Sequence, residues 1–212
     1  MRIVIPLFDG FTALDAVGPY EVLSRLPGAE VIFAAREPGV IGADSGMIGL
    51  AAEVALDDLA EVDVLVVPGG RGTRTLLEDD HLLGWIRRAH SGSQWTTSVC
   101  TGSLLLAAAG ILDGVRASTH WLELDTLARY GAIPVSQRIV REGKIITAAG
   151  VSAGIDMALT LAAEIAGEHT AQAIQLSIEY DPQPPFNAGS PQKAPADVVE
   201  LVRAVAAARD AS

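Results

Sequence analysis

The chain has 212 residues and a mass of 22.1 kDa, a length typical of a single α/β domain, so two independent enzymatic domains are not expected. Half of the residues (50%) are hydrophobic and 19% are charged, which excludes a disordered chain. The formal net charge of −11 disfavours nucleic acids and anionic membrane surfaces as partners, because like charges repel.

The sequence lacks the usual signals for membrane insertion or secretion. Its longest unbroken apolar run, residues 104–112, is far shorter than the ~20 residues that a bilayer span requires. The apolar run at residues 3–8 is too short for the core of a signal peptide. One cysteine, Cys100, excludes an intrachain disulfide. We therefore expect a cytoplasmic protein that does not span a membrane.

Strands and helices alternate along most of the chain. β-branched apolar runs that end at Gly, Pro or Asp predict strands, and apolar residues at helical spacing predict helices. The predicted strands are residues 2–7, 30–35, 62–67, 95–99, a short strand near Ala117, and a hairpin of 139–141 with 144–147. The predicted helices are residues 19–26, 76–90, 103–109, 122–130, 151–166, 168–177 and 197–209. Residues 39–53 indicate a hairpin or an irregular excursion, and residues 181–195 a Pro/Gly-rich loop.

This alternation implies a mainly parallel sheet sandwiched by helices in one domain, residues 1–212. In such a sheet the reactive site lies at the carboxyl ends of the strands. Three predicted strands are followed there by unusual residues: Asp15 after the first, Gly69-Gly70 after residues 62–67, and Cys100-Thr101 after residues 95–99. We expect these segments to converge.

Cys100 lies at a predicted strand-to-helix turn, in Ser98-Val99-Cys100-Thr101-Gly102. A nucleophile elbow has this pattern, with a small residue two positions after the nucleophile. The amides at the start of the following helix should lower the pKa of the thiol below its free value of ~8.5. The alternative is a cysteine that only fills the core.

The neighbouring candidates also have two interpretations. Gly69 and Gly70 could bring bare amides to a ligand, and the amides of Gly70 and Thr101 could form an oxyanion-type pocket beside the sulfur. They could instead form only a turn. Asp15 stands in an apolar stretch, where it could exchange a proton with Cys100 or cap a helix that begins near Pro19.

Several motifs, in order, resemble the ThiJ/PfpI superfamily, and within it most closely the isocyanide hydratases. The motifs are Leu14-Asp15-Ala16-Val17-Gly18-Pro19-Tyr20-Glu21-Val22, Val66-Val67-Pro68-Gly69-Gly70, Ser98-Val99-Cys100-Thr101-Gly102-Ser103, Thr119-His120-Trp121, Gly150-Val151-Ser152-Ala153-Gly154-Ile155-Asp156 and Glu179-Tyr180-Asp181-Pro182. They extend over essentially the whole chain. The resemblance implies a flavodoxin-like, class I glutamine amidotransferase-like fold and a homodimer.

The resemblance also implies functional roles. Cys100 matches the nucleophile of the family, Asp15 the acidic residue beside it, and Thr101 the following residue that orders the site. Apart from the resemblance, His120, Trp121 and Val151 are candidates for lining the site. The implied reaction is the hydration of an isocyanide, a small-molecule substrate, to an N-substituted formamide without a cofactor or a metal.

Other activities are less compatible with the sequence. Peptidase-like members of the superfamily have a His directly after the cysteine, where this chain has Thr101. AraC-type regulators share the signature, but the chain ends at Ser212 without room for their DNA-binding domain. His120 could approach the thiol or only orient and pack nearby residues. A glyoxalase-type enzyme, or a cysteine redox sensor or ligand-binding module, remains as the alternative function.

Overall fold

The structure is a computed structural model that describes residues 1–210. Residues 1–179 form one compact unit, which contains the sheet and its covering helices. Residues 180–210 belong to a second unit, which is described separately below. The assignment of residues 1–212 to one domain stays a prediction.

A seven-stranded sheet forms the centre of residues 1–179, and its strands follow the order β10-β11-β7-β6-β1-β2-β5. All neighbouring strands are parallel except β10 and β11, which form an antiparallel hairpin at one edge. The strands are β1 (Arg2–Pro6), β2 (Glu30–Ala35), β5 (Val54–Ala55), β6 (Val64–Val67), β7 (Trp95–Val99), β10 (Ile139–Glu142) and β11 (Ile145–Ala148). This confirms the mainly parallel sheet expected from the alternation of elements.

The central strands are buried on both faces, which explains their continuous apolar sequences. In the middle of the sheet Ile3 of β1 pairs with Val31 on one side and with Val64 on the other. The side chains of β6 have no exposed surface. The sequence of a parallel strand covered by helices on both faces is typically an unbroken run of Val, Ile and Leu, without alternation of apolar and polar residues.

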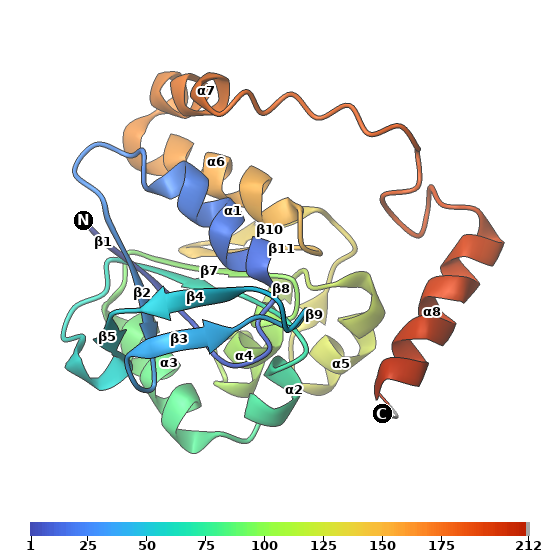
Figure 1. The fold of residues 1–212 in the computed structure, drawn as a ribbon, viewed down its shortest axis with the longest axis horizontal. Coiled ribbons are helices and arrows are strands. Elements are labelled where there is room, and N and C mark those ends of the chain that lie inside the picture. Colours follow the sequence, from blue (N-terminus) through green and yellow to red (C-terminus); the bar gives the residue numbers. More distant parts are fainter. Residues whose placement is uncertain (211–212) are drawn as a thin grey trace. The chain divides into compact units, whose positions relative to one another are not determined.

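Helices cover both faces of the sheet (Figure 1). One face carries α1 (Ala13–Leu23) and α6 (Ala153–Ala166), with α7 (Glu168–Ser177) beyond them, and the other carries α3 (Asp80–Gly92) and α4 (Gly102–Ala108). Two glycines let α1 and α6 approach closely. A Cβ atom at Gly18 would lie 3.1 Å from Cγ1 of Ile155, and one at Gly154 would lie 3.3 Å from Cγ of Pro19.

Two helices differ from the prediction. The first begins at Ala13 instead of Pro19, so Pro19 lies inside α1 and removes one backbone hydrogen bond without ending the helix. The predicted helix 76–90 is two helices, α2 (Thr73–Leu76) and α3. They are separated because Oδ1 of Asp79 accepts the amide of Leu82 and so begins a new helix.

Two further boundaries also moved. The predicted helix 122–130 consists of a 3-10 turn, η2 (Trp121–Glu123), and α5 (Leu124–Arg129). The predicted helix 151–166 begins only at Ala153, because Val151 has a φ of 22°, outside the helical region.

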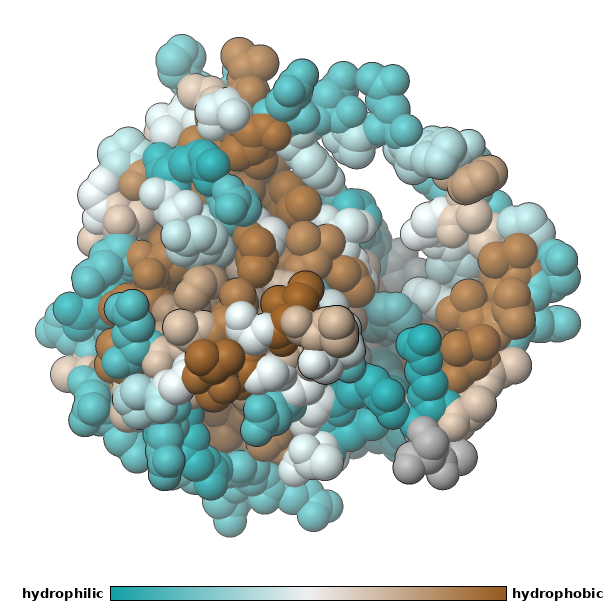
Figure 2. Space-filling view, viewed as in Figure 1, coloured by the Kyte–Doolittle hydropathy of each residue, from teal (hydrophilic) through white to brown (hydrophobic). Residues whose placement is uncertain are grey.

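The excursion at residues 39–53 is a hairpin of β3 (Gly39–Gly42) and β4 (Gly49–Ala52). Val40, Met47 and Ile48 are exposed there and belong to the apolar surface over the hairpin in Figure 2. It is followed by a 3-10 turn, η1 (Leu56–Asp58). A second small sheet pairs β8 (Arg116–Ala117) with β9 (Ile133–Pro134), a partner strand that was not predicted from the sequence.

The second unit contains the Pro/Gly-rich loop and α8 (Ala196–Asp210), close to the predicted helix 197–209. Within residues 1–210 no helix is both long and apolar enough to cross a membrane.

Candidate active site

Cys100 occupies a strained turn between β7 and α4. Its φ of 56° lies in the left-handed region, which is unusual for a residue with a Cβ atom. Its amide donates to the carbonyl oxygen of Ala149 at 2.9 Å. Its own carbonyl accepts the hydroxyls of Ser103 and Thr119, both at 3.1 Å. A side chain at Gly102 would overlap the carbonyl oxygen of Val67, so only glycine permits this turn.

Asp15 is the third residue of α1, and its side chain reaches the same site. Its side chain is fully buried, and Oδ2 accepts the amide of Gly69 at 2.9 Å. Oδ1 has no hydrogen bond partner among the described residues. A Cβ atom at Gly69 would lie 2.9 Å from Oδ2 of Asp15 and 2.5 Å from the amide nitrogen of Thr101. Only glycine at position 69 therefore lets the Pro-Gly-Gly turn pack directly against Asp15 and Thr101.

The carboxyl of Asp15 and the thiol of Cys100 perturb each other. Burial raises the pKa of Asp15 to about 7, which the hydrogen bond from Gly69 opposes and the negative charge of Asp44 reinforces. Burial and the charge of Asp15 raise the pKa of Cys100 to about 12. Ionising both groups would place two negative charges in a dry site, so near neutral pH the pair keeps at least one proton.

The direction of the thiol shift corrects the expectation from sequence, which was a pKa below ~8.5. The helix after Cys100, α4, spans only Gly102–Ala108, and the amides near the sulfur lower the thiol pKa less than burial and Asp15 raise it. Cys100 is 6% exposed. Burial and the neighbouring carboxyl therefore favour the neutral thiol of Cys100 over its thiolate.

Thr101 joins the two strand ends through its hydroxyl. Oγ1 of Thr101 accepts the amide of Gly70 at 2.9 Å and lies 3.1 Å from Oγ1 of Thr73, at the start of α2. The hydroxyl of Thr101 also lowers the pKa of the Cys100 thiol through hydrogen bonding. Thr73 is buried and was not identified from the sequence. The spacing of Thr73, three residues after Gly70, is the sequence pattern that could have identified it. Thr hydroxyls often donate to a carbonyl three residues earlier, as Thr73 does to Gly70.

The oxyanion-type pocket is arranged differently from the expectation. The amide of Gly69 is engaged by Asp15 and that of Gly70 by Thr101, so neither amide faces the sulfur. The backbone amides of Val151 and Thr101 instead interact with the sulfur and lower its pKa. Val151 holds its amide there with a φ of 22°, a strained value for a β-branched residue. Amide donors thus do reach the thiol, but Val151 takes the place expected for Gly70.

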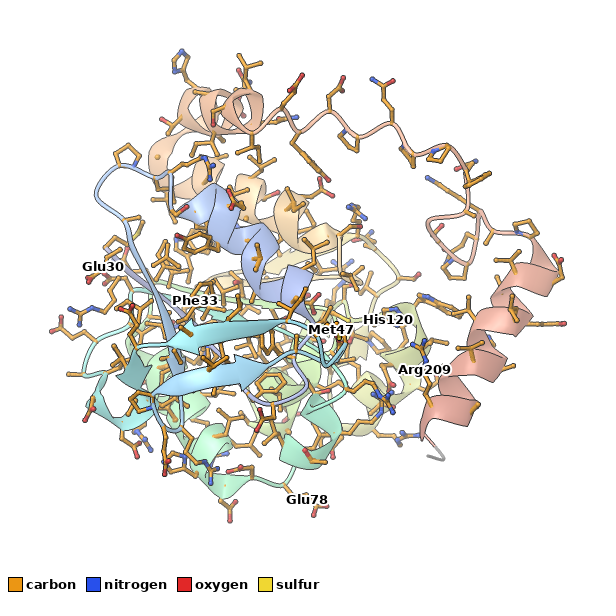
Figure 3. The ribbon with its side chains drawn as sticks, in the orientation of Figure 1. Glu30, Phe33, Met47, Glu78, His120 and Arg209 are labelled. Carbon is orange, nitrogen blue, oxygen red and sulfur yellow. The ribbon has the colours of Figure 1, made fainter. Side chains whose placement is uncertain are left out.

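His120 and Trp121 lie in the segment between β8 and α5. His120 is labelled in Figure 3. Nδ1 of His120 accepts the amide of Leu122 at 3.4 Å, and burial lowers the pKa of the ring. A Cβ atom at Gly150 would lie 2.8 Å from the His120 ring, which therefore packs beside the residue that precedes Val151. Among the described residues no hydrogen bond joins His120 to Cys100. The rings of His120 and Trp121 are 6.0 Å apart.

Features elsewhere in the molecule do not extend this site. Within residues 1–210 no group of three or more His, Cys, Asp or Glu side chains could hold a metal ion. A hollow of about 580 Å³ is lined by Val62, Asp63 and Gly92, which precede β6 and β7. It lies at the amino ends of these strands, whereas Cys100 lies at the carboxyl end of β7. The candidate site is the Asp15, Gly69, Cys100 and Thr101 cluster.

Comparisons with known proteins agree with this arrangement. The model of the DJ-1/PfpI family matches residues 1–164. The chain is 45% identical to an isonitrile hydratase of Pseudomonas putida over 207 residues, which cover 98% of this chain and 90% of that protein. Isonitrile is a synonym of isocyanide.

Solved structures share the fold. A ThiJ/PfpI family protein from Pseudomonas syringae has a TM-score of 0.92 at 38% identity, covering 97% of this chain and 86% of that one. Drosophila melanogaster DJ-1beta has a TM-score of 0.78 at 21% identity, covering 85% of this chain and 98% of that one, a likeness of fold alone. Family match, identity and fold agree, and the chain belongs to the DJ-1/PfpI family.

Proposed function

We propose that this protein hydrates isocyanides to N-substituted formamides, with Cys100 as the nucleophile and Asp15 as the group that moves protons. The observation that carries the proposal is the buried thiol–carboxyl pair in a chain so similar to an isonitrile hydratase. The thiol supplies a nucleophile, and the raised pKa of Asp15 lets the carboxyl accept and return a proton near neutral pH.

The first step is the addition of the thiol to the isocyanide R–N≡C. The Asp15 carboxylate takes the thiol proton as Sγ of Cys100 bonds to the terminal carbon, and the proton passes from Asp15 to that carbon. The product is a thioimidate, R–N=CH–S–Cys100, and Asp15 is a carboxylate again. No oxidant, reductant or net charge is required, because the S–H bond and one π bond of N≡C are lost as the S–C and C–H bonds form.

The second step is hydrolysis of the thioimidate. Asp15 takes a proton from water as the oxygen attacks the thioimidate carbon, and the nitrogen is protonated from the carboxyl. The tetrahedral intermediate then expels the sulfur and gives R–NH–CHO, while its hydroxyl proton returns to Cys100 through Asp15. The sum is R–N≡C plus H₂O to R–NH–CHO, with the thiol and the carboxylate regenerated.

The remaining residues of the site have supporting roles in this scheme. The amides of Val151 and Thr101 stabilise negative charge on the sulfur while it is attacking and leaving, since both favour the charged form of the thiol. Gly70 contributes through its bond to the Thr101 hydroxyl. Gly69 holds Oδ2 of Asp15, which leaves Oδ1 for proton transfer.

The buried thiol also bears on the alternatives. A redox sensor works through an exposed, low-pKa thiolate, whereas the pKa of Cys100 is raised and its surface is 6% exposed. A glyoxalase-type enzyme would use the same thiol on methylglyoxal. The test is a panel in which purified protein receives p-nitrophenyl isocyanide or methylglyoxal. Formamide from the isocyanide, with no turnover of methylglyoxal, is the expected result, and turnover of methylglyoxal alone would overturn the proposal.

A further inference from the structure

The backbone is hydrogen-bonded on both sides of Cys100. The peptide group before Cys100 donates its amide hydrogen to the carbonyl oxygens of Ala149 at 2.9 Å and Ala148 at 3.2 Å. The peptide group after Cys100 accepts, at its carbonyl oxygen, the hydroxyls of Ser103 and Thr119, both at 3.1 Å. The φ and ψ torsions of a residue lie between its two planar peptide groups, so these bonds together fix both torsions of Cys100.

The backbone conformation that these bonds fix is a strained one. With a φ of 56°, Cys100 lies in the left-handed region, and a non-glycine residue stays there only where its surroundings hold it. The two torsions also set the direction of the bond from Cα to Cβ, which carries the sulfur. The groups that hold the peptides on either side of Cys100 therefore determine where the sulfur lies.

The two hydroxyls on the Cys100 carbonyl differ in what they can fix. Ser103 belongs to α4, three residues after Cys100, so its bond is local to the turn. Thr119 is 19 residues away, in the segment after β8, and its side chain is buried. That segment is attached to the central sheet, because the amide of Ser118 donates to Oγ1 of Thr147 in β11 at 2.8 Å. Thr119 thus ties the turn to a separate part of the fold.

We propose that Thr119 is a positioning residue that holds the carbonyl end of Cys100 and so keeps the sulfur in place for attack. Ala149 holds the amide end. The residues that follow these two anchors pack against each other, since a Cβ atom at Gly150 would lie 2.8 Å from the His120 ring. The two anchors therefore stay at a fixed separation, and Thr119 acts on the reaction through Cys100 without touching the substrate.

The inference rests on Cys100 as the nucleophile of the proposed function, and its test has two readouts that should change in opposite directions. Hydration of p-nitrophenyl isocyanide needs the sulfur in one position, so Thr119→Val should lower kcat by about tenfold or more and leave KM unchanged. Alkylation by iodoacetamide needs only access to a sulfur whose residue is 6% exposed. A loosened turn should therefore speed alkylation by about threefold to tenfold, the range of one net hydrogen bond. The chain has one cysteine, so adduct mass reports Cys100 alone.

Two further variants separate positioning from a loss of stability. Thr97→Val is the matched control, because Oγ1 of Thr97 also donates from a buried side chain to a backbone carbonyl, that of Leu65, at 3.1 Å. Both Val substitutions remove one buried hydroxyl bond and should lower the free energy of unfolding to a similar extent. Thr97→Val should nevertheless leave kcat and the alkylation rate unchanged. Thr119→Ser retains the hydroxyl and should restore both rates to those of the wild type.

Three outcomes would overturn the inference. They are equal alkylation rates for folded Thr119→Val and the wild type, the same rate increase in Thr97→Val, and an unchanged kcat of Thr119→Val. If the wild type does not hydrate the isocyanide, the proposed function fails, while the alkylation rates still decide the role of Thr119. If Thr119→Val does not fold, Thr119→Ala replaces it in the same comparison, with Thr119→Ser as its hydroxyl-bearing partner.

Discussion

The amide of Gly69 donates a 2.9 Å hydrogen bond to one oxygen of the Asp15 carboxyl, while the other oxygen is buried without a partner among the described residues. Half of the carboxylate is therefore stabilised by the backbone and half is not. Burial raises the pKa of Asp15 to about 7 in spite of the Gly69 bond. In the proposed mechanism Oδ1 is the oxygen that takes the proton of the Cys100 thiol.

The first prediction concerns the pH dependence of catalysis. The value of kcat/KM for isocyanide hydration should rise with pH through about 7 and then level off, because Asp15 must be ionised to take the thiol proton. Cys100 itself loses its proton only near 12. The measurement is a pH–rate profile from formamide production. A value that falls with pH across this range would mean that the acid form of Asp15 is the active one.

Asp44 should set the position of that profile. Its negative charge raises the pKa of Asp15, and Oδ2 of Asp44 accepts the hydroxyl of Thr12 at 2.6 Å. Asp44→Asn removes the charge and retains an acceptor for Thr12. The midpoint of the profile should therefore move to lower pH while the plateau stays close to that of the wild type. An unmoved midpoint would show that Asp44 does not act on Asp15 in solution.

Asp15→Asn should affect stability as well as rate. The pKa of Asp15 is raised from 3.8 to about 7 on folding, so between these values the unfolded chain binds fewer protons than the folded one. The stability that Asp15 contributes is complete below 3.8 and is lost as pH rises through about 7. Asn does not titrate. The free energy of unfolding of Asp15→Asn minus that of the wild type should therefore increase by about 2–3 kcal/mol from about pH 5 to about pH 8.

Denaturant unfolding at the two pH values measures this difference, and the steady-state rate of the same samples measures the loss of proton transfer. Activity should fall by about 10²–10⁴-fold. A constant stability difference at both pH values would show that the pKa of Asp15 is not raised.

Gly69→Ala should reduce activity through sterics alone. The added Cβ atom would lie 2.5 Å from the Thr101 amide nitrogen and 2.7 Å from its Oγ1, so the turn must shift and displace Thr101 and Asp15. Gly92→Ala is the matched control, because a Cβ atom there meets nothing within 4 Å. We expect at least a tenfold loss of kcat/KM for Gly69→Ala, in line with the sensitivity of catalysis to small displacements, and none for Gly92→Ala. Equal activities would show that the turn tolerates a side chain.

Much of the fold was predictable because it follows from local sequence patterns. The buried runs of β1 and β6 indicate a parallel sheet, and the motif around Cys100 indicates a sharp strand-to-helix turn at its carboxyl edge. The contact between Asp15 and Gly69 could be expected because the carboxyl ends of parallel strands meet at one edge of the sheet. The homodimer and the cytoplasmic location that the sequence suggested stay predictions.

The features that were not predicted depend on three-dimensional contacts. The sign of the Cys100 pKa shift follows from burial and from the distance to Asp15, neither of which a motif contains. From the sequence, the amide of Gly70 was expected to face a ligand. In the structure it donates to Thr101, and this bond between two strand ends cannot be predicted from local sequence. The strained φ of Val151 and the buried bond of Thr73 likewise result from packing in the folded chain.

The most direct test of the account is formamide production from p-nitrophenyl isocyanide by the wild-type protein and by Cys100→Ala, which differ only in the side chain that carries the proposed nucleophile. The account predicts multiple turnovers by the wild type and no formamide above the buffer rate from the variant. Turnover by Cys100→Ala at the wild-type rate would contradict it, because the thiol would then have no part in the reaction.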